Sequence, residues 1–191
     1  YNFTGVYSNQ NIISRGLLDS EIAIFEISIL NKIFKKIPHK VLFKTYPNTW
    51  DYPDENPILK VANEIDNLKI YSKNIDSRFI MHKSRIIVTS RLTSTLSWSI
   101  MSGKPVIFFN IDDKIFSRSE VMKLIKDSII VIDKNEKNFY SHACSFLSKP
   151  INEIRDIYER KKSAREEFIK NFITSQKNKV GKKISKIILD A

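Results

Sequence analysis

The stretch RIIVTSRLTSTLSWSIMSGKPVIFFN, residues Arg85 to Asn110, decides the fold class of this chain. It holds two mainly apolar runs, Arg85–Thr89 and Pro105–Phe109, on either side of a polar segment. Uninterrupted apolar runs of this length are typical of strands covered on both faces of a parallel sheet. Gly103 supplies the left-handed residue that ends a helix, and Pro105 prevents the helix from continuing. The stretch therefore predicts a strand–helix–strand unit.

Hydroxyl side chains gather where this central helix is expected to begin. They are Ser90, Thr93, Ser94, Thr95, Ser97 and Ser99. A Ser or Thr at a helix start accepts from the free backbone N–H groups of the first turn. The same N–H groups and the positive end of the helix dipole attract anions. Because open α/β sheets bind ligands at the carboxyl ends of their strands, we predict an anion site here. The alternative is that the hydroxyls only cap the helix.

Strand and helix patterns alternate on both sides of this unit. Further strands are expected at residues 1–6, 41–44, 68–71 and 128–132, with helices at 18–37, 57–62, 74–81 and 116–126. From Asn135 onward only helical patterns remain, at 135–147, 150–173 and 180–189. Strands that alternate with helices predict an α/β fold with a parallel sheet of about five strands and helices on both faces.

The strand at 41–44 runs into TYPNTWDYPDENP, a segment too rich in aromatic residues for a flexible linker. Lys44, Tyr46 and Trp50 therefore lie at or just beyond the carboxyl end of a strand, where a ligand is expected. Packing of the aromatic rings in a loop is the alternative.

Composition narrows the function classes. The chain has 191 residues, of which 42% are hydrophobic, and this suits a globular domain. No apolar run approaches the ~20 residues of a membrane-spanning helix, and no signal peptide is visible at the start. The single cysteine, Cys144, is expected to be a buried structural residue in a reducing compartment. The scattered histidines make a zinc site unlikely, and Asp112 and Asp113 read as solvated turn residues more readily than as metal ligands.

Several catalytic motifs are absent from the sequence. There is no G-x-G-x-x-G, no G-x-x-x-x-G-K-[ST] and no G-x-S-x-G. This argues against a dinucleotide-binding domain, a P-loop enzyme and an α/β-hydrolase.

The net charge is +11, and cations concentrate towards the C-terminus. They are Arg160, Lys161, Lys162, Arg165, Lys170, Lys177, Lys179, Lys182, Lys183 and Lys186. Such a basic face predicts attraction to an anionic partner, such as phosphate, a membrane surface or nucleic acid. A solvated helix face in a Lys-rich protein is the alternative. Nucleic acid is not expected, because basic motifs interleaved with aromatics are lacking.

The order of the central motifs resembles the C-terminal, nucleotide-sugar-binding domain of the GT-B glycosyltransferases. The most similar kind are bacterial surface-polysaccharide transferases, including the Kdo transferases and the glycerophosphotransferases of capsule and teichoic acid synthesis. The resemblance covers roughly residues 41–132 and rests on FKTYP (43–47), VTSRLTST (88–95) and GKPVIFFN (103–110). Lys44 matches the basic residue of the family pattern, and Tyr46 stands where His is usual. Thr93, Ser94 and Thr95 match the Ser/Thr group that opens the helix, with Ser90 just before them.

This resemblance implies a single Rossmann-like domain, a three-layer sandwich with its sheet core at residues 1–134 and terminal helices at 135–191. Its donor-binding residues would be Lys44, Tyr46, Ser90, Thr93, Ser94 and Thr95. No metal and no cofactor beyond the nucleotide-sugar donor is implied. The catalytic base would come from an N-terminal domain that this chain lacks, so the chain is expected to be a piece of a longer protein. The acidic residue that often holds the donor ribose has no clear counterpart here.

The expected partners are a nucleotide-sugar donor, a glycan or lipid-linked acceptor and an anionic membrane surface. The expected location is the cytoplasm, or the inner face of the membrane. Two other functions stay open at this point: a sugar-nucleotide epimerase of the same fold, and a non-catalytic α/β module that binds through its basic face.

Overall fold

In the computed structural model of the chain, the described residues are 3–8, 19–44, 57–71, 75–90, 94–111 and 119–173. Their strands are β1 (Phe3–Ser8), β2 (Lys40–Lys44), β3 (Leu68–Tyr71), β4 (Ser84–Thr89), β5 (Val106–Asn110) and β6 (Ile130–Asp133). Their helices are α1 (Asp19–Ile29), α2 (Pro57–Asn63), α3 (Arg78–Met81), α4 (Ser94–Met101), α5 (Ser119–Ser128), α6 (Phe139–Leu147), α7 (Ile151–Glu159) and α8 (Lys162–Phe168). Two π-helical segments, η1 (Leu30–Phe34) and η2 (Ile169–Ile173), continue α1 and α8.

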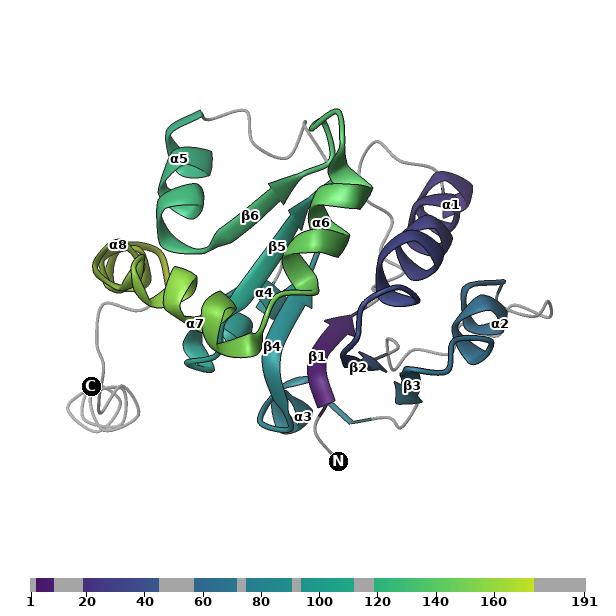
Figure 1. Ribbon diagram of the computed structural model, residues 1–191. Coiled ribbons are helices and arrows are strands. Elements are labelled where there is room, and N and C mark those ends of the chain that lie inside the picture. The colour runs from purple at the N-terminus through teal and green to yellow at the C-terminus, as the bar shows by residue number, and fades with distance from the viewer. Residues whose placement is uncertain are drawn as a thin grey trace, which may run out of the picture.

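All six strands form one parallel sheet in the order β3-β2-β1-β4-β5-β6. The α/β class and the Rossmann-like sheet are confirmed, with six strands instead of about five. From β1 the chain adds strands in one direction, and from β4 it adds them in the other. Because parallel crossovers are right-handed, the helices of the two halves fall on opposite faces of the sheet. Figure 1 shows α6 in front of the sheet and α4 behind it.

The apolar runs that predicted the sheet are buried as expected. Every residue of β5 is buried, and in β4 only Arg85 is exposed. Gly103 ends the turn after α4 at φ 70°, and its N–H donates to the carbonyl of Ile100 at 3.5 Å. The central strand–helix–strand prediction is therefore confirmed, including the glycine that ends the helix.

Some boundaries differ from the sequence predictions. The first strand, expected at residues 1–6, is β1 at Phe3–Ser8, and it lies at the centre of the sheet between β2 and β4. Ser128 ends α5 instead of starting a strand, and β6 begins at Ile130. The helix expected from Asn135 begins at Phe139, because the backbone first makes turns anchored by Asp133 and Glu136.

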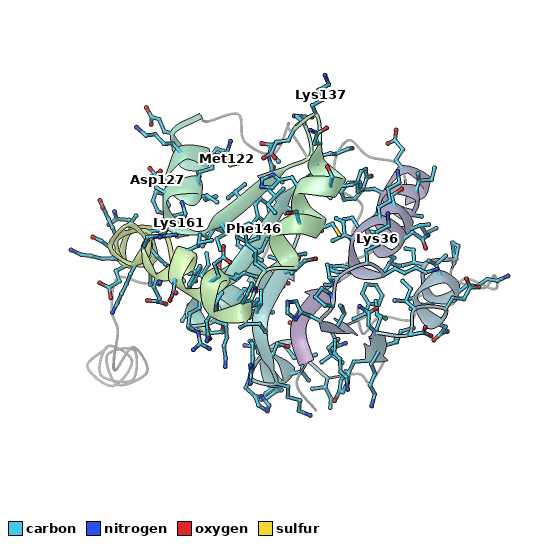
Figure 2. All side chains as sticks on the ribbon, in the orientation of Figure 1. Lys36, Met122, Asp127, Lys137, Phe146 and Lys161 are labelled. Carbon is cyan, nitrogen blue, oxygen red and sulfur yellow. The ribbon has the colours of Figure 1, made fainter. Side chains whose placement is uncertain are left out.

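The long helix expected from Pro150 to Ile173 is broken at Arg160 and Lys161, between α7 and α8. This break lets cations reach the last carbonyls of α5. Lys161 Nζ donates to the Lys126 carbonyl at 2.6 Å, and Figure 2 shows Lys161 beside the end of that helix. Arg165, only 7% exposed, donates from Nη1 to the carbonyls of Tyr158 at 2.8 Å and Ser128 at 3.4 Å. Cations at a helix C-terminus satisfy its free carbonyls and its dipole.

Cys144 lies half-buried on α6 and packs against the core, where burial was expected. Within the described ranges no helix is long and apolar enough to cross a membrane. Trp50, Asp112, Asp113 and residues 180–189 lie outside the described residues.

Candidate functional site

The strand order reverses between β1 and β4, and ligands of open α/β sheets bind at the carboxyl edge beside such a reversal. Three chain positions meet at this edge. Ser8 of β1 pairs with Lys44 of β2, and Tyr7 pairs with Val88, so that Thr89 is the next residue of β4 along the same row. Two strand spacings, about 10 Å, separate the backbones of Lys44 and Thr89.

Lys44 and Thr89 lie on the same face of the sheet. Val6 pairs with both Leu42 and Ile87, and each polar residue lies two positions further along its strand. Leu42 packs against Ile80 of α3, so this is the face that α3 covers. α3 in turn contacts α4, which also contacts β4. The face that carries Lys44 and Thr89 is therefore the face on which α4 begins.

Lys44 is fully buried, with 1% of its surface exposed. Burial lowers the pKa of its ammonium group, because the charged form loses its water, and the carboxylate of Asp76 partly opposes this effect. The sequence predicted Lys44 as a donor-binding residue at the end of its strand. The structure places the side chain in the interior beneath the edge, with its ammonium group out of solvent.

Asp76 is held by Arg78. It accepts from Nε of Arg78 at 3.1 Å, from Nη2 at 2.9 Å and from the backbone N–H of the same residue at 2.8 Å. The side-chain hydrogen bond from Arg78 is the main cause that lowers the pKa of Asp76, and Lys44 adds to it. The Arg78 guanidinium also lies over the ring of Trp98 on α4, 4.4 Å from its centroid. This chain of contacts links the charge beneath the sheet edge to α4.

The hydroxyls around α4 divide into different roles. Ser94, the first residue of α4, is exposed, whereas Ser90 and Thr95 are 3% and 2% exposed. Ser99 Oγ donates to the carbonyl of Thr95 at 2.7 Å, a bond within the helix that serves no ligand. Of the described hydroxyls in this group, Ser94 is therefore the one at the helix start that is open to solvent.

Thr89 is a residue that the sequence prediction of the site did not include. It is 1% exposed, and its Oγ1 has no hydrogen-bond partner among the described residues. A buried hydroxyl without a partner is uncommon, because it loses water and gains nothing in return. A Thr that ends an apolar strand is the signal that could have singled it out.

The structure brings together Lys44, Ser90, Ser94 and Thr95 of the predicted donor-binding set, at the ends of β2 and β4 and the start of α4. Tyr46 and Thr93, the remaining members, lie outside the described residues. Sequence reasoning also missed Asp76, Arg78 and Trp98, whose contacts with the site are made in space.

Chemically, this edge is suited to an anion. It combines the first turn of α4, whose N–H groups are free of helical partners, with an exposed hydroxyl and a buried ammonium group. In the described part of the chain, no three His, Cys, Asp or Glu residues gather closely enough to hold a metal ion.

No protein-family model and no curated protein sequence matches the chain. Among solved structures, it is similar to the spinosyn forosaminyltransferase SpnP, with a TM-score of 0.49 and 12% sequence identity. The match covers 98% of this chain and 44% of that protein, so the chain spans less than half of its length. A similarity at this level concerns the overall architecture and does not extend to the residues of a site.

Proposed function

We propose that this chain is the donor-binding half of a glycosyltransferase, which holds a nucleotide-sugar at the carboxyl edge of its sheet. The observation that carries the proposal is the meeting of the strand-order reversal with the first turn of α4, where Ser94 is exposed. The matching motifs in the sequence, from FKTYP to GKPVIFFN, support the same assignment. We place the enzyme in surface-polysaccharide synthesis because of that resemblance alone.

The chemistry of the site agrees with this function. A nucleotide-sugar carries phosphate charge, and its transfer leaves a phosphate on which negative charge builds up. N–H groups at a helix start and a nearby ammonium group stabilise such charge without reorganising during the reaction. In the proposed site α4 and Ser94 contact the phosphates directly, and Lys44 acts from beneath through its field. The catalytic base and the glycan or lipid-linked acceptor are proposed to come from outside the chain.

The first experiment is thermal-shift and calorimetric titration with CMP-, UDP- and CDP-linked sugars. A ligand at about 100 times its Kd stabilises a protein by about 2.7 kcal/mol, which is easily measured. We expect stabilisation by one of these nucleotide classes and about tenfold weaker binding in Ser94→Ala, because a hydrogen bond to a charged group is lost.

The matched control is Ser97→Ala, on the same helix but past its first residues, which should bind as the wild type does. The proposed site is rejected if Ser94→Ala and Ser97→Ala bind equally well. Product analysis with the proposed two-domain enzyme distinguishes a glycosyltransferase from a sugar-nucleotide epimerase. If the product is an epimerised free sugar nucleotide and no glycosyl group is transferred, the enzyme is an epimerase and not a transferase.

A further inference from the structure

The hydroxyl of Thr89 makes no hydrogen bond to a described residue that would explain it as a structural group. It lies at the end of β4, 1% exposed, and its Oγ1 has no partner among the described residues. Valine has nearly the same shape and would fill the position without a polar atom to bury. An unpaired buried hydroxyl is open to a partner that the ligand-free chain does not contain.

The position of Thr89 points to that role. It is the last residue of β4, beside the reversal of strand order, and the paired positions of β5 continue its row through Phe108. It shares its face with α4 and with the buried Lys44. The donor groups on this side of the edge are thus a helix start, an ammonium group and an unpaired hydroxyl.

We propose that the Thr89 hydroxyl is a ligand-positioning donor, which hydrogen-bonds a phosphate oxygen of the ligand held at the start of α4. This inference rests on the proposed function. It adds a residue that is not in the donor-binding set implied by the family resemblance. In the free chain the hydroxyl is desolvated and unpaired. Phosphate binding gives it an acceptor, so that a cost present in the free state is relieved in the bound state.

The chain offers a matched control at the other end of the same strand. Ser84 is the first residue of β4, is 1% exposed, and its Oγ also has no partner among the described residues. It lies at the amino edge of the sheet, a full strand length from α4's first turn. Its side chain lies on the opposite face of the strand from that of Thr89, so loss of its hydroxyl should leave ligand binding unchanged.

The test measures thermal stability and affinity for inorganic pyrophosphate and for the nucleotide that binds the wild type best, in Thr89→Val, Thr89→Ser and Ser84→Ala. We expect Thr89→Val to melt at the wild-type temperature or above it, and to bind both probes at least about tenfold more weakly, because a hydrogen bond to a charged group is lost. Thr89→Ser, which keeps the hydroxyl, should stay within about threefold of wild-type affinity. Ser84→Ala should bind as the wild type does.

The outcomes separate the two proposals. If the wild type binds neither probe, the proposed function and this role of Thr89 both fail. If the wild type binds, Ser94→Ala weakens it and Thr89→Val does not, the anion site stands and only the role of Thr89 is overturned. A marked loss of stability in Thr89→Val would also overturn it, because the hydroxyl would then be a structural group with a partner.

Discussion

Lys44 is the residue of the candidate site whose environment differs most from what the sequence suggested. A lysine at a strand end is ordinarily solvated, but this one has 1% of its surface exposed and sits near the carboxylate of Asp76. Burial disfavours the charged form, so the pKa of Lys44 lies below its ordinary value of 10.5. Burial of a cation costs its hydration free energy, and in the proposed site the same burial would strengthen the field at an anion bound to the edge. Such an exchange of stability for function is common at binding sites.

This leads to a prediction for Lys44→Met. Between the lowered pKa in the folded state and about 10.5, the unfolded chain binds more protons than the folded chain at this residue, so the stability of the wild type rises with pH. The variant lacks this contribution. We therefore expect the free energy of unfolding of Lys44→Met to exceed that of the wild type most near neutral pH. This difference should shrink as the pH approaches 10.5. Urea denaturation at several pH values measures it, and a pH-independent difference would contradict the burial argument.

At the scale of elements, one buried guanidinium joins α8 to the end of α5. Arg165 donates to the carbonyls of Tyr158 and Ser128, and lies over the Tyr158 ring at 3.7 Å from its centroid. Ser128 Oγ, 2.6 Å from the carbonyl of Leu124, is also 3.2 Å from the carbonyl of Ala164 on α8. These polar contacts join α5, α7 and α8, and the sequence alone did not predict them.

We expect Arg165→Met to lower the free energy of unfolding by about 2–4 kcal/mol, because buried carbonyls lose their donor. Arg160→Met, at an exposed neighbouring position, should change it by less than about 0.5 kcal/mol. Denaturant titration compares the two variants directly. Equal stability of both would mean that solvent replaces the guanidinium and that the contact is not what holds α8.

At the scale of the whole molecule, the charge of +11 is the dominant property. On the described C-terminal helices, Arg160, Lys162 and Lys170 are exposed, and Phe172, two residues after Lys170, is 53% exposed. Exposed cations next to an aromatic ring suit the surface of an anionic membrane, where a lipid-linked acceptor would be found. This partner remains a proposal that follows from charge and exposure.

We expect the chain to co-sediment with vesicles that contain an anionic phospholipid and not with purely zwitterionic vesicles. Binding should fall as salt is raised, because exposed charges are screened. The double variant Lys162→Glu/Lys170→Glu should bind more weakly than the single variant Lys36→Glu, whose residue is exposed on another side of the molecule (Figure 2). Binding that ignores lipid charge and salt would exclude an electrostatic membrane contact.

Sequence alone determined the layered α/β class and most of the elements, because both follow from local patterns. The apolar runs of β4 and β5 mark strands that are covered on both faces, and Gly103 with Pro105 marks the end of α4. The hydroxyls of residues 90–95 could likewise be placed at a helix start from spacing alone. What these patterns cannot specify is which strands become neighbours, since strand pairing depends on contacts between distant residues.

Only the tertiary structure decided the strand order and the environment of each polar group. It put β1 at the centre of the sheet, buried Lys44, left Ser94 in solvent and brought Thr89 to the reversal of strand order. The polar contact between α8 and the end of α5 is likewise distant in sequence, since Arg165 and Ser128 are 37 residues apart in the chain. Local sequence sets how the backbone folds over a few residues. Burial and pairing depend on what the rest of the chain brings alongside.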